Sequence, residues 1–432
     1  MDVRIVALSH LRPVLQSPIG VPAHDPSATS APGEHWRRNG YVMAATVFAV
    51  FTGFAFVVPF LPLFVRELGV RDDESVVLWA GALIGVAPLL AGLMAPVWGR
   101  LADRHGHKRM AIRALVAYVV LLALSAGAGS PLELLALRAG VGLAGGIGPL
   151  SLAMASARAP REMTGKVVGL VQSAQILAAA AGPLIGGALA DRIGIRATFL
   201  VTAGVCACAL VVVLLLYKEA PGSGVRASGA PAPLSLAGLL RLPSAAALLA
   251  LLFLSNFVSR SFTPVLPLHL ESLGVPADRL ASSTGALISA YSVAAATSAW
   301  AYGAASRRHA PRRLLAMSLL GGCLSIAPMA VVPTFAVFLA LAVAFGLVSG
   351  GTLALGYTIG ARTVPEEQRG AAFGFLSGAA LFGGAVAPSV AGVLAHWHMK
   401  GIYYLDALIY LALLAGPLRL VDRSRGRDEA AF

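Results

Sequence analysis

Residues 59–70 read PFLPLFVRELGV, and residues 264–275 read PVLPLHLESLGV. The two stretches share Pro, Leu, Gly and Val at matching places, and each matched pair is 205 positions apart. The same offset aligns a second, distant region. There the matched pairs are Pro160 and Pro365, Glu162 and Glu367, Gly165 and Gly370, Gly169 and Gly374, Pro183 and Pro388, and Gly187 and Gly392. Because one constant offset connects two separate regions, the chain is predicted to consist of two repeats.

The composition is that of a membrane protein. Of the 432 residues, 57% are hydrophobic and only 12% are charged, about half the charged share usual in soluble domains. The apolar runs have about twenty residues each, the length of a helix that crosses a bilayer; a transmembrane β-barrel would show shorter alternating segments. The composition therefore excludes a soluble enzyme, a nucleic-acid reader and a disordered protein, and predicts an all-α polytopic membrane protein.

Twelve apolar segments are expected to span the membrane. They are residues 41–65, 77–100, 110–129, 132–157, 165–189, 197–217, 244–268, 281–304, 312–331, 334–361, 371–395 and 401–420. We expect a disordered N-terminal tail (1–40), a six-helix bundle (41–217), a Pro- and Gly-rich linker (218–243), a second bundle (244–420) and a C-terminal tail (421–432). Six spans per repeat is an even number, so the repeats are parallel, and the substrate path is expected between them.

Basic residues gather in alternate connections of these spans. Formal net charge is +13, and Lys and Arg accumulate in cytoplasmic loops of membrane proteins. Both tails, the linker and the connections near residues 100–113, 158–166, 307–313 and 362–369 are rich in Lys and Arg. The opposite connections hold few: Arg66, Arg71, Arg192, Arg196, Arg279 and Lys400. This bias predicts a multi-pass protein of the inner (cytoplasmic) membrane with both termini in the cytoplasm.

The connection between the second and third spans carries a candidate gate. Residues 99–109 read GRLADRHGHKR. Gly106 permits the positive φ of a tight reversal, and Asp103 is an acceptor among cations. The alternative interpretation is a solvated basic turn. The candidate residues of this gate loop are Gly99, Asp103, Arg104, Gly106, Lys108 and Arg109.

This loop resembles the one that major facilitator superfamily transporters carry between their second and third spans, with His107 where Arg is usual. The resemblance implies the fold of twelve helices in two parallel six-helix repeats. It also implies that the loop is a cytoplasmic latch between the halves, in which Asp103 and Arg104 act. The second copy, residues 303–313, has Arg307 in place of the acid, so a second latch is expected to be degenerate.

The fifth span carries a pattern of small residues. Gly169 is followed by Ala178 and then by GPLIGG at residues 182–187. Such residues let helices approach closely, and Pro183 permits a bend. Generic helix packing is the alternative. The pattern resembles the antiporter signature of twelve-span drug:proton antiporters, which implies an exporter. Its candidate residues are Gly169, Gly182, Pro183, Gly186 and Gly187.

The candidates for ion coupling begin with Arg138 in the fourth span. An arginine within an apolar helix is costly and marks function by default, although snorkelling to the interface is the alternative. Its Arg-x-x-x-Gly spacing resembles the fourth-span motif of proton-coupled antiporters, with Val141 where Gln is usual. The first span holds no carboxylate, where many drug:proton antiporters have one. The other candidates, each expected at a membrane interface, are Glu133, His269 and Asp406.

Four further polar residues are expected to line the substrate path. Asn256 and Arg260 are four apart and share one helix face, and Gln172 and Gln175 lie in the fifth span. Either glutamine can bind substrate or bridge helices. Two cations, Arg138 and Arg260, without a central acid favour neutral or anionic amphiphiles over organic cations.

The sequence holds no nucleotide-binding loop and no hydrolase or metal motif, so we expect neither enzyme activity nor a cofactor or metal. Its three cysteines are interpreted as small buried hydrophobes. The prediction is a secondary transporter that exports small amphiphilic compounds in exchange for protons, working as a monomer in the lipid bilayer. The alternatives are an importer or facilitator of a small metabolite on the same fold, and a receptor-like protein that does not transport.

Overall fold

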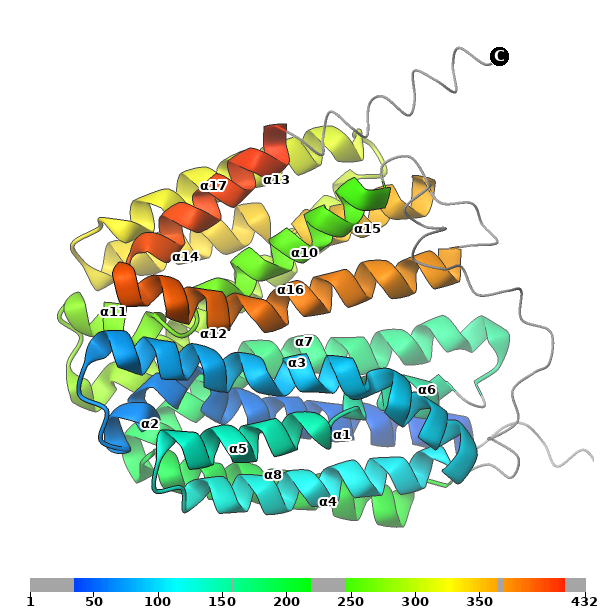
Figure 1. The fold of residues 1–432 in the computed structure, drawn as a ribbon. Helices are drawn as coiled ribbons and strands as arrows, with labels where there is room; N and C mark the ends of the chain where they lie inside the picture. Colours follow the sequence, from blue (N-terminus) through cyan, green and yellow to red (C-terminus); the bar gives the residue numbers. More distant parts are fainter. Residues whose placement is uncertain (1–34, 157–158, 219–244, 364–368, 416–432) are drawn as a thin grey trace, which may run out of the picture.

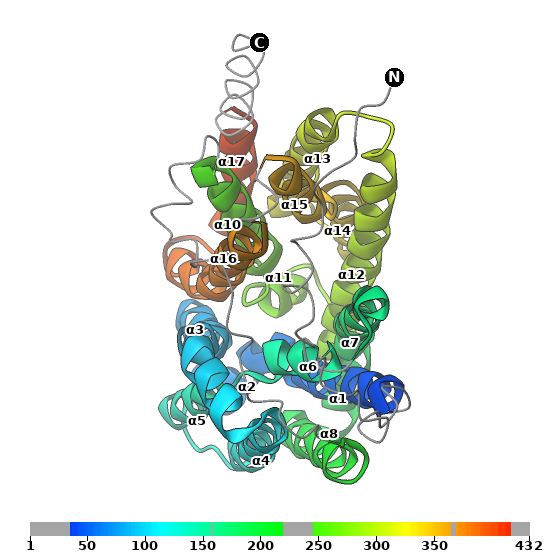
Figure 2. The same cartoon turned by 90° about the vertical axis from the view of Figure 1, so that its right-hand side faces the viewer.

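The computed structural model describes residues 35–156, 159–218, 245–363 and 369–415, and within these ranges the secondary structure is helical. The expected tails before residue 35 and after residue 415 lie outside the described residues, as does nearly all of the expected linker. The helices form two groups, α1 to α8 and α10 to α17 (Figure 1). Figure 2 shows the two groups facing each other, with α3 beside α16 and α7 beside α12.

The first half contains six helical units. The first is α1 (His35–Val57), which continues through η2 (Val58–Phe60) into α2 (Leu61–Glu67). The others are α3 (Asp73–His105), α4 (His107–Ala126), α5 (Pro131–Leu143) with α6 (Ile147–Ser156), α7 (Arg161–Ile193) and α8 (Ile195–Leu216).

The second half repeats this order. Its units are α10 (Ala245–Ser261) with α11 (Leu266–Ser272), η3 (Ala277–Arg279) with α12 (Leu280–Ala305), α13 (Pro311–Ile326) with η4 (Ala327–Ala330), α14 (Phe335–Ser349) with α15 (Thr352–Thr363), α16 (Arg369–Trp397) and α17 (Gly401–Ala415).

These units confirm the fold predicted from the sequence. Nine helical units among the described residues are long and apolar enough to cross a membrane, and the α10–α11 pair, bent by 45°, is a tenth. The helices α12 and α17 occupy the places in the second repeat that α3 and α8 occupy in the first, and complete the twelve. The predicted spans agree with the observed ones within a few residues.

The breaks in the helices follow the residues that permit them. Pro59 and Pro62 coincide with the change from α1 to η2 and α2, since proline cannot donate the backbone hydrogen bond of a regular helix. Gly106 has a φ of 92° in the tight turn between α3 and α4, and Gly146 has a φ of 118° between α5 and α6. The positive φ expected at Gly106 is therefore present.

The start of the first helix differs from the expectation of a tail that reaches residue 40. The helix α1 begins at His35. Asn39 stabilises the first turns of α1. Its Nδ2 donates to the Lys218 carbonyl oxygen at 2.9 Å, and its Oδ1 accepts from the Lys218 N–H at 3.3 Å. These two hydrogen bonds tie the beginning of α1 to the end of the first half, a contact that the local sequence does not reveal.

One cysteine also differs from its expectation. Cys206 and Cys323 are buried, as expected, but Cys208 is exposed on the surface of α8. Cys206 and Cys208 are two residues apart on one helix and point in different directions. The exposed position on an apolar helix suits a small residue that faces lipid.

Candidate functional site: the interface between the halves

The molecule has two ends that differ in charge. We call the end with the connections 68–72, 127–130, 273–276, 331–334 and 398–400 the charge-poor end, because it holds few Lys and Arg residues, and the end with Gly106 and residues 306–310 the basic end. In Figure 1 the charge-poor end lies at the left, beside α2 and α11. The distinction matters because the contacts between the halves that are described below gather toward the charge-poor end.

Two proline carbonyls, one from each half, lie against a glycine of the opposite half. The carbonyl oxygen of Pro183, in α7, lies against Gly285 of α12, and that of Pro388, in α16, lies against Gly81 of α3. A Cβ atom at either glycine would collide with the carbonyl that it faces. Pro183 and Pro388 are equivalent in the two repeats, so the two contacts are related by the pseudo-twofold axis of the fold. Glycine is required here for close approach.

The small residues predicted in the fifth span form this packing. A Cβ at Gly182 would meet Ala55 of α1, and one at Gly186 would meet the Phe56 backbone of the same helix. Gly187 instead faces the backbone of Ala281, in the other half. The small residues of the span-five pattern thus allow α7 to pack closely against α1 on one side and against α12 on the other. Gly169 differs, because nothing lies within 4 Å of the place its Cβ would take.

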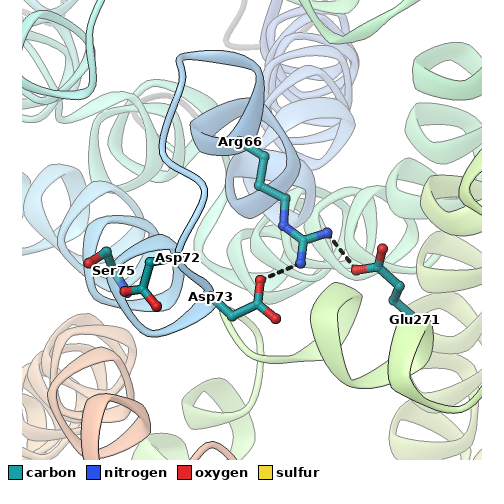
Figure 3. A network of polar contacts seen from close by, with 5 residues as sticks. All are labelled: Arg66, Asp72, Asp73, Ser75 and Glu271. Atoms are coloured by element: carbon teal, nitrogen blue, oxygen red, sulfur yellow. Dashed lines mark hydrogen bonds and ion pairs between the residues drawn. The ribbon is translucent and has the colours of Figure 1, made fainter.

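An ion-pair network joins the halves at the charge-poor end (Figure 3). The two guanidinium Nη atoms of Arg66, in α2, donate to Glu271 Oε2 and to Asp73 Oδ1, each at 2.5 Å. Glu271 belongs to α11 in the second half and Asp73 to α3 in the first. Arg66 therefore bridges one carboxylate from each half. Its side chain is 28% exposed and that of Glu271 is 40% exposed, so solvent screens the pair only in part.

Helix termini add polar contacts at the same end. The Asp191 carboxylate, at the end of α7, accepts hydrogen bonds from the backbone N–H groups of Ala281 (3.2 Å) and Ser282 (2.8 Å) in the first turn of α12. A carboxylate at a helix N-terminus satisfies donors that have no partner within the helix. One half therefore caps a helix of the other.

The second repeat makes the corresponding contact. His396, equivalent to Asp191, lies with its Nδ1 3.5 Å from Glu74 Oε2 at the start of α3. The N-cap of α3 is Asp72, whose Oδ2 accepts from the Ser75 N–H at 2.8 Å (Figure 3). Hydrogen bonding to Ser75 lowers the pKa of Asp72. The N-terminus of α3 is thus capped from within its own half and contacted from the other.

The gate loop lies at the basic end and makes contacts within the first half. Lys108 Nζ donates to the carbonyl oxygens of Leu214 (3.0 Å) and Tyr217 (2.8 Å), at the end of α8. Asp103 Oδ1 is 4.0 Å from His107 Nε2, and its side chain is half exposed. Arg104 and Arg109 are exposed, and Gly99 has open space where a Cβ would lie. The latch between the halves stays a prediction for a conformation closed at this end.

Arg138 is buried rather than snorkelled to the surface. It is 2% exposed, and its Nε donates to the Leu83 carbonyl oxygen of α3 at 3.1 Å. One turn further along α5, Gly142 lies against the backbone of Ala87. The Nη1 atom of Arg138 is buried without a hydrogen-bond partner. A buried cation between α5 and α3 fits the functional interpretation of this residue better than the snorkelling one.

Glu133 lies at the surface, as expected, and has a structural contact. Its Oε2 accepts from the Gly129 N–H at 2.9 Å, while its own N–H donates to Ser130 Oγ at 3.2 Å. This arrangement is a variant of the capping box at the start of α5, in which the Glu133 carboxylate accepts from Gly129, the residue before the N-cap Ser130. The contact stabilises the start of α5, which gives the Glu133 carboxylate a structural role that does not involve ion coupling.

His269 and Asp406 were predicted near a membrane interface, and the structure shows that neighbouring helices cover both side chains. Both are fully buried in the second half. His269 Nδ1 is 2.9 Å from the Tyr403 hydroxyl, and Ser261 Oγ is 2.6 Å from Asp406 Oδ2. Their places near helix ends suggest an interface, but neighbouring helices cover these ends. Tyr403 and Ser261 were not predicted; the spacing of Tyr403 and Asp406 on one face of α17 is the signal that points to such a cluster.

The four predicted path residues lie on two helices. Asn256 Nδ2 donates to the Ala380 carbonyl oxygen at 2.7 Å, which ties α10 to α16. Arg260 is exposed at the end of α10 and passes close to Gly384. On α7 of the other half, Gln172 is exposed and Gln175 is partly buried. Among the described residues, no three His, Cys, Asp or Glu side chains form a group that could hold a metal ion.

Comparison with known proteins agrees with this architecture. The family model of the Major Facilitator Superfamily matches residues 43–283 and 280–431. The multidrug resistance protein MdtG of Proteus mirabilis is 30% identical over 380 residues, which cover 87% of this chain and 93% of that protein. MdtG of Yersinia enterocolitica is 32% identical over 307 residues, which cover 71% and 74% of the two chains.

Solved structures share the fold at low sequence identity. A bacterial homologue of the human lysosomal transporter Spinster, in an inward-facing and unoccupied conformation, has a TM-score of 0.73 at 13% identity and covers 90% of this chain and 98% of its own. The nucleoside transporter NupG has a TM-score of 0.70 at 13% identity, with 88% and 99% covered. The chain thus belongs to the Major Facilitator Superfamily and is a multi-pass membrane transporter.

Proposed function

We propose that this transporter exports small amphiphilic compounds in exchange for protons by alternating access. The observation that carries the proposal is that the small residues of the span-five pattern lie at close helix contacts. Gly182 and Gly186 pack α7 on α1, and Gly187 packs the same helix on α12. The similarity to multidrug resistance proteins over most of both chains supports export of drug-like compounds.

The contacts at the charge-poor end define one state of the cycle. The Arg66–Glu271 ion pair, the Asp191 cap and the two glycine–proline contacts hold the halves together there. If the positive-inside rule sets the orientation, this end faces away from the cytoplasm. The structure is then the inward-facing state. Both termini lie in the cytoplasm, and the protein resides in the inner membrane. Rocking of the halves would break these contacts and bring the Asp103 loop against the second half.

The charges within the spans bear on the substrate. Arg138 is a buried cation without an acidic partner among its described contacts, and Arg260 is exposed near the α10–α16 contact. Neutral or anionic amphiphiles suit these groups better than organic cations do. An importer of a small metabolite is the second candidate, because the nucleoside transporter NupG has the same fold.

The proposal is tested by substrate-driven proton movement in liposomes. The purified protein is reconstituted with a pH dye inside, and a panel of neutral, anionic and cationic amphiphiles is added. We expect neutral or anionic compounds to move protons through the wild-type protein, and Arg138→Met to lose at least nine-tenths of this signal. Transport with no proton movement would exclude antiport. A strict preference for organic cations would contradict the proposed substrate class.

A further inference from the structure

One face of α17 carries three polar side chains inside the second half. Tyr403, Asp406 and Tyr410 follow one another at intervals of three and four residues, which places them on the same face of a helix. All three are fully buried. A carboxylate in such a place needs a partner, because an isolated charge is costly to bury.

The groups around Asp406 are neutral. Ser261 of α10 makes its hydrogen bond, at 2.6 Å. Its electrostatic neighbours are hydroxyls of Tyr291 on α12, and of Tyr403 and Tyr410 on α17 itself. Among the described residues, no arginine or lysine forms an ion pair with this carboxyl group, whose Oδ1 has no hydrogen-bond partner.

The charged and titratable groups on the helices packed around α17 have other partners or places. Arg260 of α10 interacts electrostatically with Tyr291. His269 of α11 contacts the Tyr403 hydroxyl and interacts electrostatically with Lys400. His396 of α16 lies beside Glu74 at the charge-poor end. The helix α13 contributes the buried thiol of Cys323 and, in its first turn at the basic end, Arg312 and Arg313. The described contacts thus leave Asp406 without a neutralising cation.

The hydrogen bonds of Ser261 indicate where a proton lies. Its Oγ is 2.6 Å from Asp406 Oδ2 and 3.0 Å from the Val258 carbonyl oxygen. A hydroxyl has one proton, so it can donate to only one of these two acceptors. If Asp406 is protonated, its carboxyl group donates to Ser261 Oγ, and Ser261 donates to Val258. Both short contacts are then hydrogen bonds, and no buried charge remains.

We infer that Asp406 is a proton-binding site of this transporter, holding a proton in the second half while the charge-poor end is closed. The inference rests on the proposed function in one respect, that the bound proton is the one exchanged for substrate. Binding forms one O–H bond on the carboxylate and removes one negative charge from the bundle. Release returns the proton to water when a conformational change opens the Asp406–Ser261 contact.

Infrared difference spectroscopy tests the protonation directly. The wild-type protein in lipid at pH 7 is expected to show the C=O stretching band of a buried protonated carboxyl group. Asp406→Asn should remove this band, and the matched control Asp278→Asn, at an exposed residue of the same half, should retain it. Ser261→Ala should move the band to higher frequency, because the carboxyl group loses its hydrogen-bond partner. A spectrum of Asp406→Asn that equals the wild-type spectrum would overturn the inference.

A transport measurement tests the coupling. We expect Asp406→Asn to retain exchange of labelled for unlabelled substrate, which needs no net proton movement, and to move at least tenfold fewer protons per substrate. If the variant moves as many protons as the wild type, coupling through Asp406 is wrong and the proposed antiport stands. If the wild type moves none, the proposed antiport fails, and the infrared band still decides whether Asp406 holds a proton.

Discussion

Arg66 and Glu271 occupy the same position in the two sequence repeats and form an ion pair with each other at 2.5 Å. They are 205 positions apart, which is the offset that aligns the repeats. Two equivalent residues touch only where they meet the axis that relates the halves. Two identical charged side chains at this place would repel each other. The opposite charges of Arg66 and Glu271 instead attract, and so hold the two halves together at the charge-poor end.

Breaking this pair should favour opening of the charge-poor end. A half-exposed ion pair contributes about 0.5–1 kcal/mol, which corresponds to a change of about two- to fivefold in the ratio of two states. We expect Glu271→Gln to raise the reactivity of a cysteine placed near the network by that factor. Exchange of the charges, Arg66→Glu with Glu271→Arg, is made together with Asp73→Asn so that two carboxylates do not meet, and should restore the value of the Asp73→Asn protein. Asp73→Asn is the control, since it leaves the pair between the halves intact. Equal reactivity in wild type and Glu271→Gln would exclude a gating role for the pair.

Two glycines of α7 provide a matched test of the interface. Gly187 lies against the Ala281 backbone in the other half, whereas Gly169 has open space around the place of a Cβ. Gly187→Ala should oppose closure and reduce transport at least tenfold. Gly169→Ala should leave transport within about twofold, because alanine favours a helix by about 1 kcal/mol and meets no neighbour. Transport rates in liposomes at equal protein content measure both.

If Gly169→Ala abolishes transport and Gly187→Ala does not, the span-five pattern acts through a conformation other than the one described. A thermal unfolding curve for each variant separates this outcome from simple loss of folded protein.

The carboxylate of Glu133 should be dispensable for coupling. Glutamine also completes a capping box, so Glu133→Gln is expected to retain proton movement and substrate transport. Ser130→Ala removes the other half of the box and should lower the stability of α5 by about 1 kcal/mol, seen as a lower Tm with transport retained. A loss of proton movement in Glu133→Gln at unchanged Tm would place this residue in the coupling pathway after all.

Much of this architecture was predictable from the sequence. The lengths of the apolar runs predict the spans, and the 205-residue offset predicts the two halves. The turn at Gly106 and the close packing at Gly182 and Gly186 follow from residue size and backbone freedom. These features depend on local chemistry along one segment, which a sequence displays directly.

The burial of His269 and Asp406 was not predicted. Distance from a helix end indicates depth along the membrane normal, but it does not say which neighbouring helices cover a side chain. The hydrogen bond from Asn39 to Lys218 likewise joins residues 179 positions apart. Contacts of this kind depend on the packing of several helices, and a single sequence without its fold does not specify them.

The most direct test of alternating access is a pair of distance measurements, one at each end of the molecule. Spin labels are placed in cysteine-free protein at Arg71 and Pro276 for the charge-poor end, and at the exposed His105 and His309 for the basic end. Substrate under a proton gradient should lengthen the first distance and shorten the second within the same sample. If the two distances change in the same direction, or if neither responds, the halves do not alternate between two closed ends and the proposed mechanism is wrong.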